Sequence, residues 1–210
     1  MSQHRCPRCE IRRPLCFCGL IPQITLRTRV IILMHTAEAM LTTNTARLAA
    51  KALLNSDLRI RGRKEECSSA DDFVQSGRTS LLLYPSPHAI ELNADFVATL
   101  KGQVNLIVPD GSWSQTRRFV RREGGLAGIP HVKLPKGPAS EYRLRIQPQE
   151  DGLCALEAIA RSLGILESCE AQQRLEALLR VMVERTLWSR GTIAADECTT
   201  GGIPQGAFFS

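Results

Sequence analysis

Residues 104–113 read VNLIVPDGSW, an apolar run that stops at a proline, an aspartate and a glycine. Such a run predicts a buried strand followed by a turn. Two similar runs precede it at residues 30–34 and 81–84, and a shorter one follows at residues 131–134. Helical spacing of apolar residues is found at 43–54, 89–100, 114–122, 154–163 and 170–188, and Ser114 is the expected N-cap of the third of these helices. This alternation predicts an α/β fold, with a mostly parallel sheet and helices on both faces.

The composition of the chain is that of an ordinary globular protein. It has 210 residues, of which 43% are hydrophobic and 23% charged, and no apolar run reaches the roughly 20 residues of a membrane helix. The N-terminus is polar and lacks the apolar core of a signal peptide, so we expect a cytoplasmic protein with reduced or metal-bound cysteines.

The formal net charge of +6 comes largely from three basic clusters. Their members are Arg59, Arg61, Arg63 and Lys64; Arg117, Arg118, Arg121 and Arg122; and Lys133, Lys136, Arg143 and Arg145. Any one cluster is adequately explained as a solvated basic face. Three of them together favour a surface that contacts a phosphate backbone.

Four of the eight cysteines lie near the N-terminus, in the pattern Cys6-x2-Cys9-x6-Cys16-x-Cys18. This spacing predicts a tetrahedral zinc site, and four thiolate ligands leave no open position for a catalytic water, so the ion would be structural. Disulfides or unrelated free thiols are the alternatives. We therefore divide the chain into a zinc-binding module at 1–25, an α/β domain at 26–190 and a loosely held tail at 191–210.

Two strand-end loops carry the candidate chemistry, Tyr84-Pro85-Ser86 and Asp110-Gly111-Ser112-Trp113. Ligands of α/β sheets bind beyond the carboxyl ends of the strands, so both loops are expected to border one pocket. An aspartate and glycine after a strand more often form a simple turn, however, and a tryptophan there is more often core.

The order of several motifs resembles the DTW-domain family. They are the N-terminal cysteines, His35-Thr36-Ala37-Glu38, Thr43-Asn44-Thr45-Ala46-Arg47, Tyr84-Pro85-Ser86, Asp110-Gly111-Ser112-Trp113, Ser140-Glu141-Tyr142-Arg143-Leu144-Arg145 and Cys154-Ala155-Leu156-Glu157. Ser112 stands where the family commonly has threonine.

The resemblance implies a tRNA aminocarboxypropyltransferase. Such an enzyme transfers the 3-amino-3-carboxypropyl group of S-adenosylmethionine to N3 of a tRNA uridine and releases methylthioadenosine. The family is similar to the SPOUT methyltransferases, which implies a C-terminal trefoil knot.

The site residues carried over from the resemblance fall into three groups. Asp110 is the candidate general base, with binding of the donor as an equal alternative. Donor-binding residues would be Tyr84, Pro85, Ser86, Asp110, Gly111, Ser112, Trp113, Ser140, Tyr142, Arg143, Cys154 and Glu157. RNA-binding residues would be Asn44, Arg47, Arg117, Arg118 and Arg145. A SPOUT-type RNA methyltransferase and a zinc-bearing RNA-binding protein without catalysis are the competing functions. The residues do not indicate the tRNA, the position of the uridine or the oligomeric state.

Overall fold

A computed structural model describes residues 4–62, 69, 72–145 and 152–209. Its strands are β1 (Arg29–His35), β2 (Ser56–Arg61), β3 (Arg78–Leu83), β4 (Ile90–Glu91), β5 (Gln103–Asp110) and β6 (His131–Lys133). Its α-helices are α1 (Thr45–Ala52), α2 (Ala94–Thr99), α3 (Trp113–Arg122), α4 (Ala155–Leu166) and α5 (Cys169–Ser189). Short 3-10 helices lie at Arg13–Leu15, Cys18–Leu20, Glu38–Met40, Gly124–Leu126 and Gln205–Ala207.

The strands form one six-stranded sheet in the order β2-β1-β5-β3-β6-β4, and each neighbouring pair is parallel. The central strands β1 and β5 are buried along most of their length, as expected for strands covered on both faces. Alternate residues of β1 and β5 belong to two separate apolar clusters. The predicted α/β fold with a mostly parallel sheet is confirmed.

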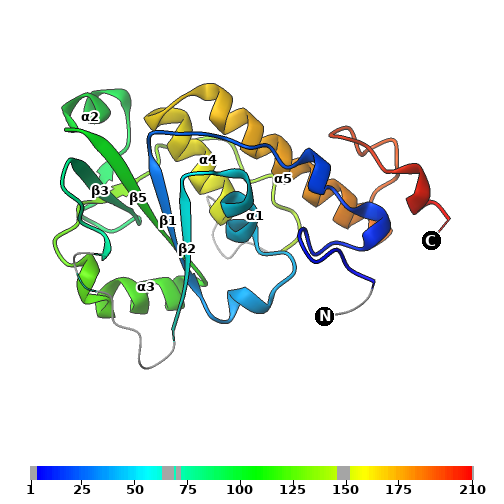
Figure 1. Ribbon diagram of the computed structural model, residues 1–210, viewed down its shortest axis with the longest axis horizontal. Coiled ribbons are helices and arrows are strands. Elements are labelled where there is room, and N and C mark those ends of the chain that lie inside the picture. The colour runs from blue at the N-terminus through cyan, green and yellow to red at the C-terminus, as the bar shows by residue number, and fades with distance from the viewer. Residues whose placement is uncertain (1–3, 63–68, 70–71, 146–151, 210) are drawn as a thin grey trace.

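Helices cover both faces of this sheet (Figure 1). On one face α1, α4 and α5 pack against Val30, Ile32 and Leu106 in the larger cluster. On the other face Phe119 and Val120 of α3 pack with Ile31 and Ile107 in the smaller one.

Several predicted boundaries were wrong. The expected helix at 89–100 is shorter, because its first part forms β4 and α2 begins after Asn93, which caps it. The N-cap of α3 is Ser112 rather than Ser114, since the Ser112 hydroxyl accepts a hydrogen bond from the backbone N–H of Gln115.

The edge strand β2 was not predicted, and part of its arginine cluster is used inside the fold. Arg59 pairs with Asp57 at 2.8 Å and stacks over the ring of Phe73 at 5.4 Å. It is therefore not a free phosphate-binding group, while Arg63 and Lys64 lie outside the described residues.

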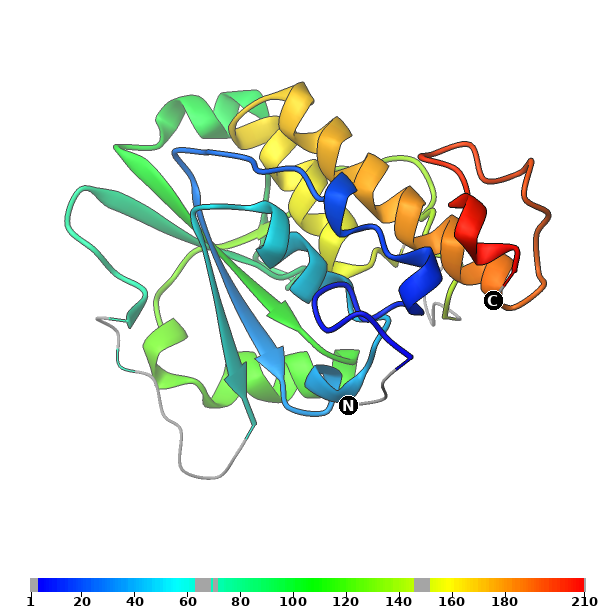
Figure 2. The ribbon, with the colours of Figure 1, turned by 45° about the vertical axis from the view of Figure 1, so that its right-hand side comes forward.

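The segment after α5 is held firmly, contrary to the prediction of a loose tail. The buried guanidinium of Arg185 donates hydrogen bonds to the carbonyls of Gly201 and Gly202 and, on its other side, to those of Leu15 and Cys16. The N-terminal module and the tail thus flank the same end of α5 (Figure 2).

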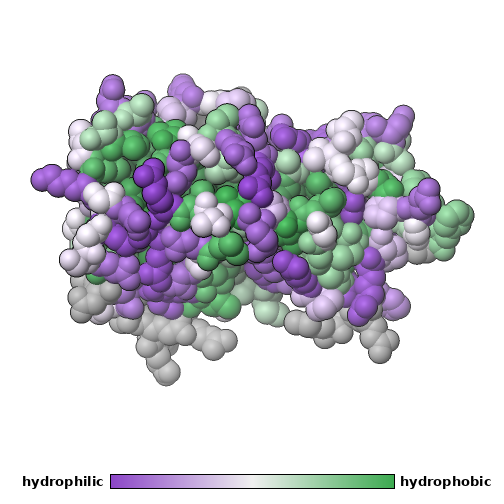
Figure 3. All heavy atoms as spheres, turned by 45° about the horizontal axis from the view of Figure 1, so that its top comes forward, coloured by the Kyte–Doolittle hydropathy of each residue, from purple (hydrophilic) through white to green (hydrophobic). Residues whose placement is uncertain are grey.

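Within the described residues, no helix is both long enough and apolar enough to cross a membrane. Patches of hydrophilic and hydrophobic side chains are intermixed on the face of the molecule seen in Figure 3.

Candidate active site and metal site

Asp110 is the last residue of β5 and lies beside Met34 of β1, at the carboxyl edge of the sheet. Its Oδ2 atom accepts a 2.7 Å hydrogen bond from Nδ2 of Asn44. The other end of the same amide, Oδ1 of Asn44, caps α1 by accepting the backbone N–H of Arg47. The helix cap therefore fixes the amide that orients the Asp110 carboxylate.

The surroundings of Asp110 make it a stronger base than an ordinary aspartate. Removal from water, with a smaller contribution from the nearby Glu38 carboxylate, raises its pKa from 3.8 to about 6. The hydrogen bond from Asn44 and the positive charges of Arg145 and Arg47 oppose this shift without cancelling it. At neutral pH the group is thus ionised yet able to accept a proton.

The second motif segment, residues 140–145, reaches the same loop that carries Asn44. The Tyr142 hydroxyl donates to the backbone carbonyl of Thr43 at 2.9 Å. Arg145 pairs with Glu38 at 3.0 Å and donates to the Thr43 hydroxyl at 3.2 Å. Residues far apart in the sequence are therefore joined through Glu38 and Thr43 next to Asp110.

Glu157 holds the 140–145 segment against the start of α4. Its buried carboxylate accepts the Ser140 hydroxyl at 2.6 Å, the backbone N–H of Glu141 at 2.7 Å and that of Cys154 at 2.9 Å. Cys154 itself is the buried N-cap of α4, and burial raises the pKa of its thiol. These contacts give Glu157 and Cys154 a structural role, and their contact with a donor stays a prediction.

The loop after β3 lies differently from the expected shared pocket. Tyr84 packs against the cluster on the α3 face, whereas Asp110 contacts α1 on the opposite face. Ser86 forms a 2.8 Å hydrogen bond with Nδ1 of His131, whose ring also meets that of Tyr84 edge to face. The side chains of Tyr84 and Asp110 therefore extend toward opposite faces at the carboxyl edge of the sheet, and a donor pocket that both loops border stays a prediction.

The residues that follow Asp110 have distinct local roles. A Cβ atom at Gly111 would lie 3.0 Å from Oε1 of Gln115 and 3.2 Å from Cβ of His35, so the absence of a side chain allows the close approach. Ser112 and Gln115 form a capping box at the start of α3. A threonine could supply the same hydroxyl, which explains why serine is acceptable here. Trp113 remains 37% exposed and is free to contact a ligand.

Over residues 3–187 the sequence matches the DTW domain family. The chain belongs to this family. Three curated relatives carry the name tRNA-uridine aminocarboxypropyltransferase 2. The protein from Macaca fascicularis is 29% identical over 180 residues, which cover 83% of this chain and 60% of the relative. The Mus musculus protein gives the same identity and coverage, and that of Drosophila melanogaster is 28% identical over 79% of this chain and 68% of its own length.

The DTW chain therefore spans about 60% of the length of two of these relatives. No solved structure matches it. The trefoil knot that the resemblance implies stays a prediction.

The predicted RNA-binding residues of the DTW domain differ in how far their side chains are already engaged. Arg47 forms an ion pair with Glu10 of the cysteine-bearing module and donates to the Ala39 carbonyl at 2.6 Å. Arg117 and Arg118 are exposed on α3, whereas Phe119 and Val120 of the same helix pack against the sheet. Their side chains are the more accessible to a large ligand.

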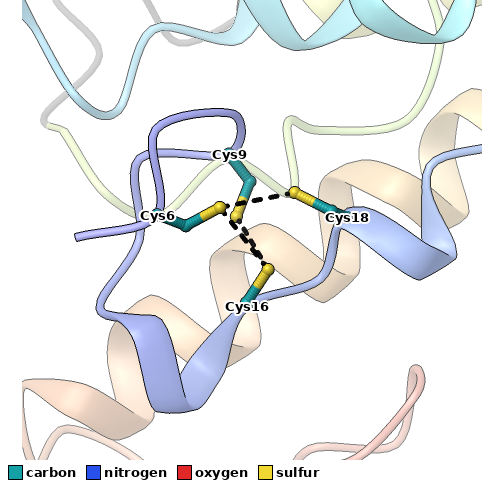
Figure 4. Close-up of side chains that lie close together, drawn as sticks. All are labelled: Cys6, Cys9, Cys16 and Cys18. Atoms are coloured by element: carbon teal, nitrogen blue, oxygen red, sulfur yellow. Dashed lines mark hydrogen bonds between the residues drawn. The ribbon is translucent and has the colours of Figure 1, made fainter.

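The four N-terminal cysteines converge as the spacing predicts (Figure 4). Their sulfur atoms lie within 4.8 Å of one another, with neighbouring pairs at 3.5, 3.6 and 3.7 Å. Tetrahedral coordination with Zn–S bonds of about 2.3 Å requires sulfurs roughly 3.8 Å apart. The cluster can therefore hold a metal ion of this kind with little adjustment.

Burial raises the pKa of the Cys9 and Cys18 thiols, whereas the pKa of the Cys6 thiol is shifted the other way. Burial acts to raise its pKa, but hydrogen bonds from the backbone N–H groups of Cys9 and Arg8 and contacts with the thiols of Cys18 and Cys16 outweigh it and lower the pKa to about 6. A thiolate is the form that binds metal.

Sequence reasoning missed the importance of three residues in this DTW domain. Glu38 and Thr43 connect the two motif segments, and Glu10 connects α1 to the cysteine module. Glu38 and Thr43 do lie within motifs that resemble the family, but nothing local in the sequence indicates their partners.

Proposed function

We propose that this chain transfers the 3-amino-3-carboxypropyl group from S-adenosylmethionine to N3 of a uridine in tRNA, giving acp3U. Membership of the DTW family and the names of its relatives support a tRNA-uridine aminocarboxypropyltransferase. The observation that carries the proposal is Asp110, an oriented carboxylate with a raised pKa at the end of β5.

The proposed reaction requires a proton acceptor. S-adenosylmethionine, when bound, supplies an electrophilic carbon next to a sulfonium that leaves as neutral methylthioadenosine. As the bond from N3 to this carbon forms and the carbon–sulfur bond breaks, the Asp110 carboxylate accepts the N3 proton. No acid is needed for the leaving sulfur, so positioning and this single proton transfer are the work of the protein.

Asn44 serves this reaction by keeping the Asp110 carboxylate in place. Its amide is held by the α1 cap and donates to Oδ2 of Asp110, and it also lies 3.3 Å from the Glu38 carboxylate. We therefore assign Asn44 a positioning role next to the reacting atoms rather than the RNA contact first expected.

The donor would be held by groups near the start of α3 and in the 140–145 segment. Exposed Trp113 offers a ring surface to the sulfonium or the adenine. The exposed guanidinium of Arg143 is suited to the donor carboxylate, because neighbouring Arg145 already pairs with Glu38. Tyr142 is buried and bound to Thr43, which makes it a support of this segment.

The RNA would contact the exposed arginines of α3, Arg117 and Arg118, whose positive charge suits phosphate. Arg145 and Arg47 would contribute positive potential while remaining ion-paired to Glu38 and Glu10. Zinc bound by Cys6, Cys9, Cys16 and Cys18 would brace the N-terminal module without taking part in the reaction.

The decisive experiment combines unmodified tRNA with isotopically labelled donor, followed by mass spectrometry of the nucleosides. A mass increase equal to the aminocarboxypropyl group, together with methylthioadenosine, is the expected result. A methyl addition would instead identify an RNA methyltransferase, and no transfer with no binding of the donor would indicate an RNA-binding protein without catalysis.

Asp110→Asn separates the two roles of this carboxylate. If Asp110 is the base, the variant binds the donor as the parent does, and turnover falls by about 100- to 10,000-fold. Loss of donor binding would instead assign Asp110 to the donor. Asp196→Asn, at an exposed position of the C-terminal segment, is the matched control.

A further inference from the structure

A solvent-open cleft of about 270 Å³ lies between the cysteine module, the loop before α1 and the end of α5. Its walls bring together three arginines from separate parts of the chain. Arg5 and Arg12 come from the paired segments around the cysteines, and Arg190 caps the C-terminus of α5.

These arginines give the cleft a positive charge. All three are exposed, and two of them donate to backbone carbonyls: Arg5 to that of Glu10 at 2.8 Å and Arg190 to that of Leu144 at 3.5 Å. Among the described residues of the lining, Glu10 is the single acidic one, and its carboxylate is paired with Arg47. The charge of the three guanidinium groups is thus available to an anion.

The cleft also adjoins the candidate active site. Thr42 and Thr43 form part of its wall. Thr43 is the residue that accepts hydrogen bonds from Tyr142 and Arg145, and the next residue, Asn44, binds Asp110. An anion in the cleft therefore lies close to the loop that orients the reacting carboxylate.

We propose that this cleft binds backbone phosphates of the RNA substrate next to the reacting nucleotide. The inference rests on the proposed function, since it takes RNA as the substrate. Guanidinium groups bind phosphate through paired hydrogen bonds, and the threonine hydroxyls can donate further ones. The site is distinct from the arginines of α3, which lie on the other face of the sheet.

The test measures binding of tRNA, without donor, over a range of salt concentrations. Arg12→Gln and Arg190→Gln remove one positive charge each and keep a polar side chain. Log K for association with tRNA falls as log salt rises, and each variant is expected to make this negative slope shallower by about 0.7 to 0.9. Binding is then about four- to fivefold weaker at 150 mM salt. The double variant should lose about twentyfold.

Two controls keep the result interpretable. Arg27→Gln removes an exposed arginine just before β1, at the amino edge of the sheet, and should leave the slope unchanged. Thermal melting and titration with S-adenosylmethionine show whether the cleft variants remain folded with an intact donor site.

Folded cleft variants that bind tRNA with the parental slope would overturn the proposed phosphate site, even if group transfer is observed. If instead the slopes fall as expected but no aminocarboxypropyl group is transferred, the cleft is confirmed and the proposed reaction fails.

Discussion

Asp110→Asn should make the protein more stable at alkaline pH. The folded state raises the pKa of this carboxyl from 3.8 to about 6, mainly through loss of hydration, so the ionised form is disfavoured in the fold. A pKa difference of this size corresponds to about 3 kcal/mol, since each pKa unit is worth about 1.4 kcal/mol. The neutral amide avoids this cost and can still accept the hydrogen bond from Asn44.

The sign and the pH window follow from the raised pKa. Below pH 3.8 Asp110 is protonated in both the folded and the unfolded state, and it does not lower the free energy of unfolding. Between pH 3.8 and about 6 the unfolded state releases this proton first, so the parent protein loses stability as the pH rises. The variant should therefore exceed the parent by about 0.5 kcal/mol at pH 4 and about 3 kcal/mol at pH 8. For a chain of this length the latter is a rise in Tm of roughly 6 to 12 °C.

Chemical denaturation at the two pH values measures this difference directly. Asp196→Asn, at an exposed position, is the control at the same two pH values. If Asp110→Asn were equally stable relative to the parent at pH 4 and pH 8, or less stable at pH 8, the raised pKa and the base role derived from it would be refuted.

Three further predictions follow from the same contacts. The kcat/KM of transfer should rise between pH 5 and pH 7 with a midpoint near the pKa of about 6 of Asp110 in the free protein, and a kcat/KM independent of pH over this range would contradict the base role. Glu157→Gln should lower the free energy of unfolding by about 3 kcal/mol in urea titrations, because an amide NH2 would then face hydrogen-bond donors that now bind the carboxylate. Glu176→Gln on α5 is the control. An unchanged urea midpoint for Glu157→Gln would show that the three hydrogen bonds of Glu157 contribute little to stability. Removal of metal with a chelator should increase hydrogen exchange around Cys6 and Cys18 and lower the Tm, whereas identical exchange with and without the chelator would mean that no ion braces this module.

The buried apolar strands β1, β3, β5 and β6 could be predicted from sequence, and so could the helices with a clear apolar stripe. Strand β2 could not, because its side chains are half-exposed and Arg59 is stabilised by Asp57 and Phe73 rather than by an apolar pattern. The limits of α2 were also out of reach, since β4 exists only through its pairing with β6.

The candidate site was predictable to a similar degree. Asp110 and the 140–145 segment follow from motifs, and the convergence of the cysteines follows from their spacing. The connection through Thr43 joins residues about a hundred positions apart, and no local preference encodes it. The opposite orientation of Tyr84 depends on the register of β3 against β5, which the sequence alone does not specify.

The buried guanidinium of Arg185 bears on where this domain ends. The family match stops at residue 187, two positions beyond Arg185, yet this side chain is bound to carbonyls at 201 and 202 as well as to the cysteine module. A chain cut where the family match ends would lack the Gly201 and Gly202 carbonyls, which accept two of the four hydrogen bonds of this side chain. Through Arg185, residues beyond the family match are thus linked to the module that carries the cysteine cluster.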